Sequence, residues 1–159
     1  HGIECKLKLY TSNLDEKMKE AIKNSESIEY CGYVTGDAFV KAFHEAQMLL
    51  HIESFDEKCI DRVKNSISTK IADSLASGIP LLAYGPSNIA SISYLKRNEC
   101  AYVITQKELL EEKLKQVLLD EEKRMEIIKN GLLVAKKNHD SVINSNTIKD
   151  TLSKMYKPV

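Results

Sequence analysis

The chain has 159 residues and carries 23 acidic and 23 basic side chains, so its formal net charge is zero. This balance excludes the basic class of general nucleic-acid binders, and no apolar run approaches the ~20 residues of a membrane-spanning helix. Four widely spaced cysteines without a CxxC pair indicate reduced, buried thiols in a cytoplasmic setting rather than disulfides or a metal site.

The apolar pattern alternates between short strands and helices along the chain. In chain order we predict a strand over 5–10, a helix over 14–22, a strand over 28–34, a helix over 36–46, a strand over 47–52, a long loop with room for one helical turn over 53–65, a short helix around 67–75, a strand over 79–83, a helix over 88–97, a strand over 100–105, and helices over 107–118, 121–137 and 141–155. This alternation predicts an α/β fold with a doubly wound, Rossmann-like parallel sheet in one domain, 1–159.

The segment 65–85 carries the most specific pattern. Ile67, Ile71 and Leu75 are spaced four apart, which places them on one apolar face of a helix. Gly78 stands where the end of a helix favours a positive φ. Residues 79–83 then form a continuous apolar run, which is typical of a strand covered on both faces.

A second edge of this helix carries polar side chains. Thr69, Lys70 and Asp73 lie close along the first turns, so a hydroxyl, a cation and a carboxylate gather there. Next to the carboxyl end of a parallel sheet, such a set suits a phosphate-and-sugar ligand. The residues alone leave a second interpretation open, in which Asp73 only complements the helix dipole. Ser66 or Ser68 would then cap the helix, beside a solvated lysine.

The segment also resembles a known family. The residues that carry the resemblance are Ser66, Thr69, Lys70, Asp73, Leu75–Gly78, Pro80, Tyr84 and Gly85. They are similar to the motif of the carboxyl-terminal, donor-binding domain of GT-B nucleotide-sugar glycosyltransferases, family 4 (group 1) in particular. The order of the predicted elements also fits that domain along most of the chain.

The resemblance implies roles for individual residues. The implied donor contacts are Asp73 for the ribose, Ser68, Thr69 and Lys70 for the diphosphate, Tyr33 and Val34 near the base, and Glu53 or Asn65 for the sugar. Free backbone N–H groups of Ser68 and Thr69 are expected to help hold the diphosphate. Asn65 departs from the acidic residue that many relatives have at this position. Glu53 and Asp56, in the longer loop, are the candidate replacements, but the favoured interpretation of both is an ordinary charged loop. No metal is implied, and no cofactor besides the donor itself.

One part of the family domain has no counterpart in this sequence. That domain opens with a further strand and helix, whose Arg and Lys clamp the diphosphate, and residues 1–4 resemble the end of that helix. We therefore expect a fragment of a larger two-domain enzyme, which alone has no turnover. In the usual strand order the absent strand lies mid-sheet, so we expect either a closed-up sheet or a gap filled by a neighbouring chain.

The implied activity is transfer of a hexose from a nucleoside diphosphate sugar to an acceptor in polysaccharide biosynthesis. The acceptor would be a saccharide or a lipid-linked molecule bound by the missing domain, with the parent enzyme at the membrane periphery. Three alternatives stay open: a nucleotide-sugar epimerase of the same fold, a non-catalytic flavodoxin-like binding module, and a pure interaction domain. His44, His51 and His139 share no metal-ligand spacing, so we expect packing or surface roles for them.

Overall fold

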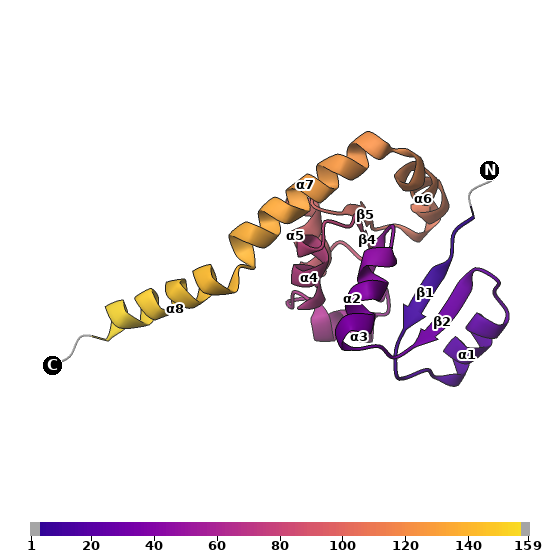
Figure 1. Cartoon of the computed structure of the whole chain (residues 1–159), viewed down its shortest axis with the longest axis horizontal. Helices are drawn as coiled ribbons and strands as arrows, with labels where there is room; N and C mark the ends of the chain where they lie inside the picture. The colour runs from indigo at the N-terminus through magenta and orange to yellow at the C-terminus, as the bar shows by residue number, and fades with distance from the viewer. Residues whose placement is uncertain (1–3, 157–159) are drawn as a thin grey trace. The chain divides into compact units, whose positions relative to one another are not determined.

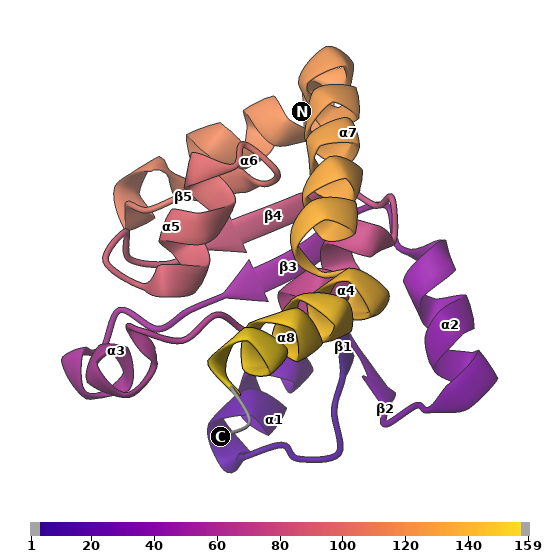
Figure 2. The same cartoon turned by 90° about the vertical axis from the view of Figure 1, so that its left-hand side faces the viewer.

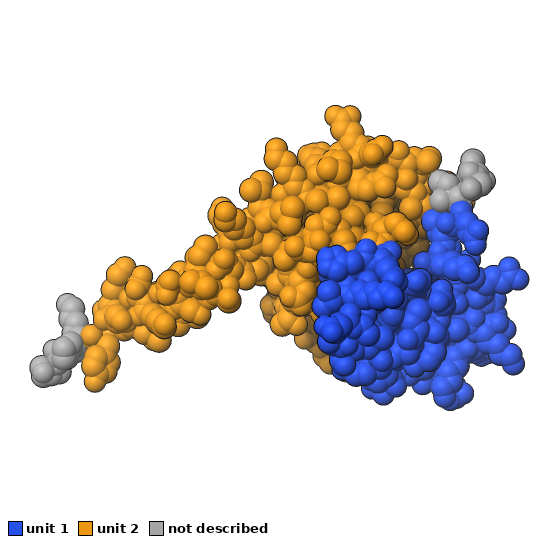
Figure 3. Space-filling model, viewed as in Figure 1, with its two compact units in different colours: residues 1–45 blue, residues 46–159 orange. Residues whose placement is uncertain are grey.

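The computed structural model describes residues 4–156 and divides the chain into two compact units. Unit 1 contains residues 1–45 and unit 2 contains residues 46–159 (Figure 3). The expectation of one domain that is part of a larger enzyme stays a prediction.

Unit 1 is a short parallel β–α–β–α segment (Figure 1). Its elements are β1 (Leu7–Tyr10), α1 (Glu16–Lys23), β2 (Ile28–Gly32) and α2 (Gly36–Glu45). The two strands pair in parallel, with Leu7 opposite Ile28. Asp15 caps α1, because its carboxylate accepts a hydrogen bond from the Met18 N–H at 2.7 Å. The structure describes every residue of α1 and α2, and none of their side chains is buried.

Unit 2 is built on a three-stranded parallel sheet in the order β3-β4-β5. The strands are β3 (Leu49–Ile52), β4 (Leu81–Tyr84) and β5 (Tyr102–Ile104). The helical segments are α3 (Glu57–Val63), α4 (Lys70–Ala76), α5 (Ala90–Arg97), the 3-10 turn Lys107–Leu109, α6 (Leu110–Leu119), α7 (Glu121–Asn138) and α8 (Ser141–Met155). Figure 2 shows β3 and β4 side by side, and α7 packs against α4.

The core of unit 2 lies on both faces of β4, so this strand is apolar throughout. On one face, Leu81 and Ala83 pack among buried residues of α4 and α5. On the other face, Leu82 packs with Ile104 and with Val117 of α6. Helix α7 packs closely against α4 at Gly131, where even a Cβ atom would lie 3.4 Å from Leu75 Cδ2.

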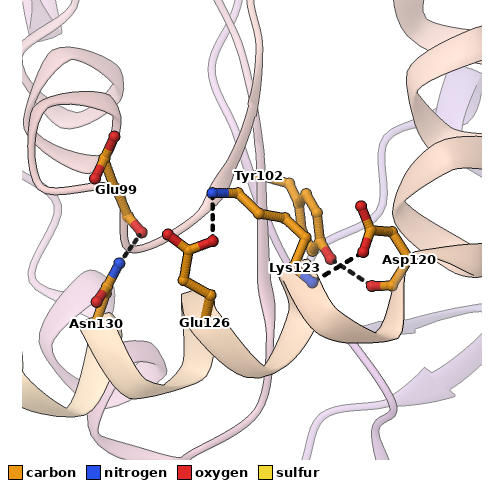
Figure 4. A network of polar contacts seen from close by, with 6 residues as sticks. All are labelled: Glu99, Tyr102, Asp120, Lys123, Glu126 and Asn130. Atoms are coloured by element: carbon orange, nitrogen blue, oxygen red, sulfur yellow. Dashed lines mark hydrogen bonds and ion pairs between the residues drawn. The ribbon is translucent and has the colours of Figure 1, made fainter.

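The start of α7 is fixed to the sheet by polar contacts (Figure 4). The Asp120 carboxylate accepts from the Lys123 N–H at 2.9 Å, and the Tyr102 hydroxyl donates to the Asp120 carbonyl oxygen at 3.2 Å. Further along the helix, the Asn130 amide donates to the carbonyl oxygen of Glu99, a residue with a φ of 49°. These contacts hold the turn before β5 against α7.

Helix α8 leaves the body of unit 2 at the end of α7 (Figure 1). None of its side chains is buried, and all of them belong to the described residues. Its exposed apolar side chains include Ile148, Leu152 and Met155. Across residues 4–156, no helix is both long enough and apolar enough to cross a bilayer.

The α/β class with parallel pairing is confirmed, and so are the types of the predicted elements. Gly78 has the predicted positive φ, 72°. Four of the five predicted strands began two residues too early, whereas the strand over 28–34 begins at Ile28 as predicted and ends early, at Gly32. Strand length follows the hydrogen-bond partner: β3 begins at Leu49, whose N–H donates to the Pro80 carbonyl oxygen. The loop predicted over 53–65 contains a helix, α3, which Asp56 caps through the N–H groups of Lys58 and Cys59.

The expected closure into one sheet stays a prediction, because it would join strands of unit 1 to strands of unit 2. The described strands pair as β1-β2 in one sheet and β3-β4-β5 in another. The other expectation, a gap filled by a neighbouring chain, stays a prediction. The cysteines were expected to be buried, but among them only Cys100 is, while Cys5 is exposed and the other two are partly exposed.

Candidate functional site

The carboxyl ends of β3, β4 and β5 meet at one edge of the sheet of unit 2, because the strands are parallel. The ladder continues one residue beyond the strands: the Glu53 N–H donates to the Tyr84 carbonyl oxygen at 2.9 Å, and the Gly85 N–H donates to the Ile104 carbonyl oxygen at 3.1 Å. Glu53 and Gly85 therefore lie side by side at this edge. In open α/β sheets, this edge is where ligands bind.

His51 and Glu53 form a close pair at the end of β3. Side chains alternate along a strand, so both lie on the face of Leu49, which packs against the core formed with α4 and α5. His51 Nε2 lies 3.0 Å from Glu53 Oε1, and the two side chains are only 12% and 16% exposed. The ring nitrogen is buried and has no well-aligned hydrogen-bond partner among the described residues.

The charge state of His51 depends on its surroundings. Burial lowers the pKa of His51 and outweighs the carboxylate of Glu53, which raises it. The positive charge of Lys70 also lowers this pKa, so the first residue of α4 acts on the same pair. Glu53 and Lys70, two of the predicted site residues, therefore act on the pKa of His51 in opposite directions.

Gly85 makes room for Glu53. A Cβ atom at position 85 would lie 2.7 Å from the Glu53 Cβ, 3.3 Å from the Glu53 carbonyl oxygen and 3.3 Å from Ile92 Cδ1. The first distance is shorter than any real contact between carbon atoms, so any side chain here would displace the Glu53 backbone. The small residue in the Tyr-Gly turn is therefore required by packing at this edge.

The loop before α4 is held by Ser91 of α5. Ser91 is fully buried, and its hydroxyl donates to the Ser66 carbonyl oxygen at 3.2 Å and accepts from the Ser68 N–H at 3.0 Å. The Ala90 N–H adds a bond to the Lys64 carbonyl oxygen at 2.7 Å. The expectation that the Ser68 N–H is free for a diphosphate was therefore wrong, because Ser91 already accepts from it.

The alternative interpretation, in which Ser66 or Ser68 caps α4, is also not met. Among the described contacts, α4 has no side-chain hydrogen bond at its start, and Thr69 occupies the cap position. Thr69 and Lys70 are both exposed there. The predicted role of Thr69 and Lys70 at a diphosphate stays a prediction.

Asp73 lies on the edge of α4 that faces α7. It lines an open groove of about 490 Å³. The other residues that line this groove are Ala72, Ala76, Leu132, Ala135, Lys136, His139 and Asp140. The carboxylate is exposed and not packed into an interface, so it is accessible to a ligand. Its assignment to a ribose stays a prediction.

The remaining predicted residues lie elsewhere. Asn65 is exposed in the loop between α3 and α4. Tyr33, which is 69% exposed, and Val34 follow β2 in unit 1, and their place near a base stays a prediction. The sequence analysis expected a packing or surface role for His51 and did not link it to Glu53. The available signal was a single histidine in an apolar strand, two positions before an acid and hence on the same face.

Comparison with known proteins places this geometry in context. A family model described as glycosyl transferase-like matches residues 4–150. Among solved structures, the chain is similar to WaaG, a glycosyltransferase involved in lipopolysaccharide biosynthesis, with a TM-score of 0.55 and 17% sequence identity. The match covers 77% of this chain but 30% of that chain, and at this identity it shows a GT-B-like fold. Comparison with curated proteins finds no match.

Proposed function

The chain belongs to the glycosyl transferase-like family, and from this premise we propose that it is the donor-binding domain of a glycosyltransferase. The observation that carries the proposal is the position of Glu53 beside His51, at the carboxyl edge of the sheet. Thr69 and Lys70 are exposed at the start of α4 in the same unit, where they are accessible to an anion. The donor would be a nucleoside diphosphate hexose.

Each part of the donor has a counterpart among these side chains. The Lys70 ammonium, with the Thr69 hydroxyl, would neutralise the diphosphate that leaves the sugar, because developing charge is where fixed cations help most. Asp73, three residues further along α4, would accept hydrogen bonds from the ribose hydroxyls, since a carboxylate forms the stronger kind of such bonds. Glu53 would orient the hexose.

The protein would contribute positioning and electrostatic stabilisation rather than a nucleophile. The acceptor would be a saccharide or a lipid-linked molecule in polysaccharide biosynthesis, bound by a part of the parent enzyme outside this chain. We propose that the purified 159 residues bind the donor without turning it over. Turnover of a nucleotide sugar and acceptor by this chain alone would contradict that part.

Titration with nucleotides tests the proposal. We expect UDP or GDP to shift the amide NMR signals of residues 66–73. Lys70→Met should weaken binding about tenfold or more, because a hydrogen bond to a charged group contributes about 1.5–3 kcal/mol. Lys96→Met, an exposed lysine in the last turn of α5, is the matched control and should leave affinity unchanged.

The role of Asp73 has a separate test. Wild-type chain should bind UDP or GDP more tightly than the dideoxy analogue without ribose hydroxyls, and Asp73→Ala should bind both equally. Asp61→Ala on α3 is the control that keeps the preference. If neither nucleotide moves any signal of residues 66–73, the donor-binding proposal fails; if Asp73→Ala keeps the wild-type preference, only the ribose contact fails.

A further inference from the structure

The groove between α4 and α7 has the composition of a ligand site. Its volume of about 490 Å³ is in the range of small-molecule sites. Half of its lining is apolar and made mostly of alanines, and the other half carries hydrogen-bonding groups: Asp73, Lys136, His139 and Asp140. Such a site binds a ligand through a few placed polar groups, so the partners of each of these groups decide what the groove can hold.

The two carboxylates of the groove differ in what they are free to bind. Asp140 caps α8, because its Oδ1 accepts hydrogen bonds from the Val142 and Ile143 N–H groups at 2.9 Å. Asp73 lies within α4 and is exposed in the groove. Asp73 is therefore the carboxylate that a ligand with hydroxyl groups would meet.

The ring of His139, at the end of α7, is held by Tyr94 of α5. Its Nε2 lies 2.9 Å from the Tyr94 hydroxyl, and the two rings meet edge to face with their centroids 5.8 Å apart. The side-chain amide of Asn138 donates to the same hydroxyl at 2.9 Å. Tyr94 is only 8% exposed, so these partners are not readily replaced by water. The imidazole thus has one nitrogen fixed and the other left over.

These contacts assign the proton of the neutral ring. The Tyr94 hydroxyl accepts from Asn138, and its own proton needs an acceptor because the residue is buried. Among the described residues, Nε2 of His139 is the acceptor at hydrogen-bond distance, so the ring proton resides on Nδ1. The Nδ1–H group is then the donor that His139 can offer to a ligand in the groove.

We propose that His139 is a second ribose-binding residue, whose Nδ1–H donates to the oxygen of a ribose hydroxyl that itself donates to Asp73. A hydroxyl donates one hydrogen bond and accepts others, so it fits between a carboxylate from α4 and an N–H from the end of α7. The two helices that form the groove would each supply one half of the contact. This inference rests on the proposed function, because it takes the ligand to be the nucleotide part of the donor.

The ring assignment can be tested without any ligand. In an NMR spectrum of the ring nitrogens of the full chain, at a pH where the ring is neutral, His139 should carry its proton on Nδ1. Tyr94→Phe removes the hydroxyl and should move part of the proton population to Nε2. Tyr102→Phe is the matched control, because its hydroxyl bonds to the Asp120 carbonyl oxygen. A wild-type ring with its proton on Nε2 would overturn the inference, whatever binds.

Nucleotide titration tests the contact itself. UDP or GDP should move the amide signals of residues 132–139 as well as those of residues 66–73. His139→Gln should weaken nucleotide binding about fivefold, as expected for one neutral hydrogen bond, and leave binding of the dideoxy analogue unchanged. His139→Asn should keep most of the wild-type affinity, because the asparagine amide can occupy the place of Nδ1, whereas the glutamine amide reaches the place of Nε2. His44→Gln, exposed on α2, is the matched control.

A double variant separates a ribose contact from a structural role. His139 and Asp73 would hold the same hydroxyl, so His139→Gln should have no further effect in a chain that already carries Asp73→Ala. If His139→Gln weakens binding of the dideoxy analogue as much as that of the nucleotide, the residue only maintains the groove and the inference is wrong.

The remaining outcomes separate the two proposals. If neither UDP nor GDP binds the wild-type chain, the proposed function fails and the ribose contact of His139 fails with it. If a nucleotide binds with a preference that depends on Asp73, but His139→Gln binds it as tightly as wild type, only the contact with His139 is wrong. If the nucleotide moves residues 66–73 and leaves residues 132–139 unmoved, the same conclusion follows.

Discussion

Replacing Ser91 by alanine tests how the loop before α4 is held. The change removes one fully buried hydroxyl and leaves two backbone groups without partners, the Ser68 N–H and the Ser66 carbonyl oxygen. Each buried hydrogen bond contributes about 1 kcal/mol net, and an unsatisfied partner costs about 1–3 kcal/mol. Two unsatisfied groups would together cost about 2–6 kcal/mol. Because the loop is partly exposed, water reaches these groups, so we expect a loss of about 2 kcal/mol in the free energy of unfolding, the low end of the combined range.

Urea denaturation of the full chain, followed by far-UV circular dichroism, measures this loss. For an m value of about 2 kcal/mol/M, the midpoint should fall by about 1 M. Because the chain has two compact units, amide exchange is the second measurement, and the Ser68 amide should exchange faster in the variant.

Ser93→Ala is the matched control on the same helix. Its hydroxyl donates to the Ser87 carbonyl oxygen at 2.6 Å, but the pair is exposed, so water replaces the bond. We expect a change within about 0.5 kcal/mol. A Ser91→Ala chain that unfolds at the same urea concentration as Ser93→Ala, with unchanged exchange at Ser68, would refute the reasoning.

Three further predictions follow from backbone and burial. Gly131→Ala should stabilise unit 2 by about 0.5–1 kcal/mol, because alanine favours a helix and the new methyl group meets Leu75 at ordinary contact distance; a lower midpoint would show that α7 and α4 are packed too tightly for it. Gly78→Ala should destabilise by about 1–2 kcal/mol, because φ there is 72°, and an unchanged midpoint would contradict this. Folding lowers the pKa of His51, so the unfolded chain binds more protons and the free energy of unfolding should fall as pH drops from above about 6.5 to the folded pKa of His51. His51→Gln should remove that part of the pH dependence. Parallel curves of unfolding free energy against pH for wild type and variant would contradict this.

The local parts of the fold could be predicted from sequence, and the reason differs between elements. Helices α7 and α8 were predicted to within a residue, because polar caps at Asp120 and Asp140 and a long apolar period mark them. Gly78 could be placed because a single residue type satisfies the backbone there. Helix α3 was missed as a helix, since it is short and few of its residues are apolar, although Asp56 was a visible cap.

The site could be predicted only in part, because it depends on pairing between distant segments. Lys70 and Asp73 could be named, since they share one helix with a recognisable pattern. The contact of His51 with Glu53 follows from strand alternation, but its burial depends on the cover from α4 and α5. Ser91 could not be found, because its partners are 23 and 25 residues away in the chain and no local pattern links them.

No side chain of helix α8 is buried, all of them being described, and this has a thermodynamic consequence. Isolated helices shorter than about 12–15 residues are marginal in water, and α8, with 15 residues, is close to this limit. Its hydrogen bonds are therefore sustained mainly by local interactions, such as those of the Asp140 carboxylate, which accepts from the Val142 and Ile143 N–H groups at 2.9 Å. Warming should therefore unwind this segment gradually, as a sloping baseline ahead of the sharp melting of the body from which it emerges.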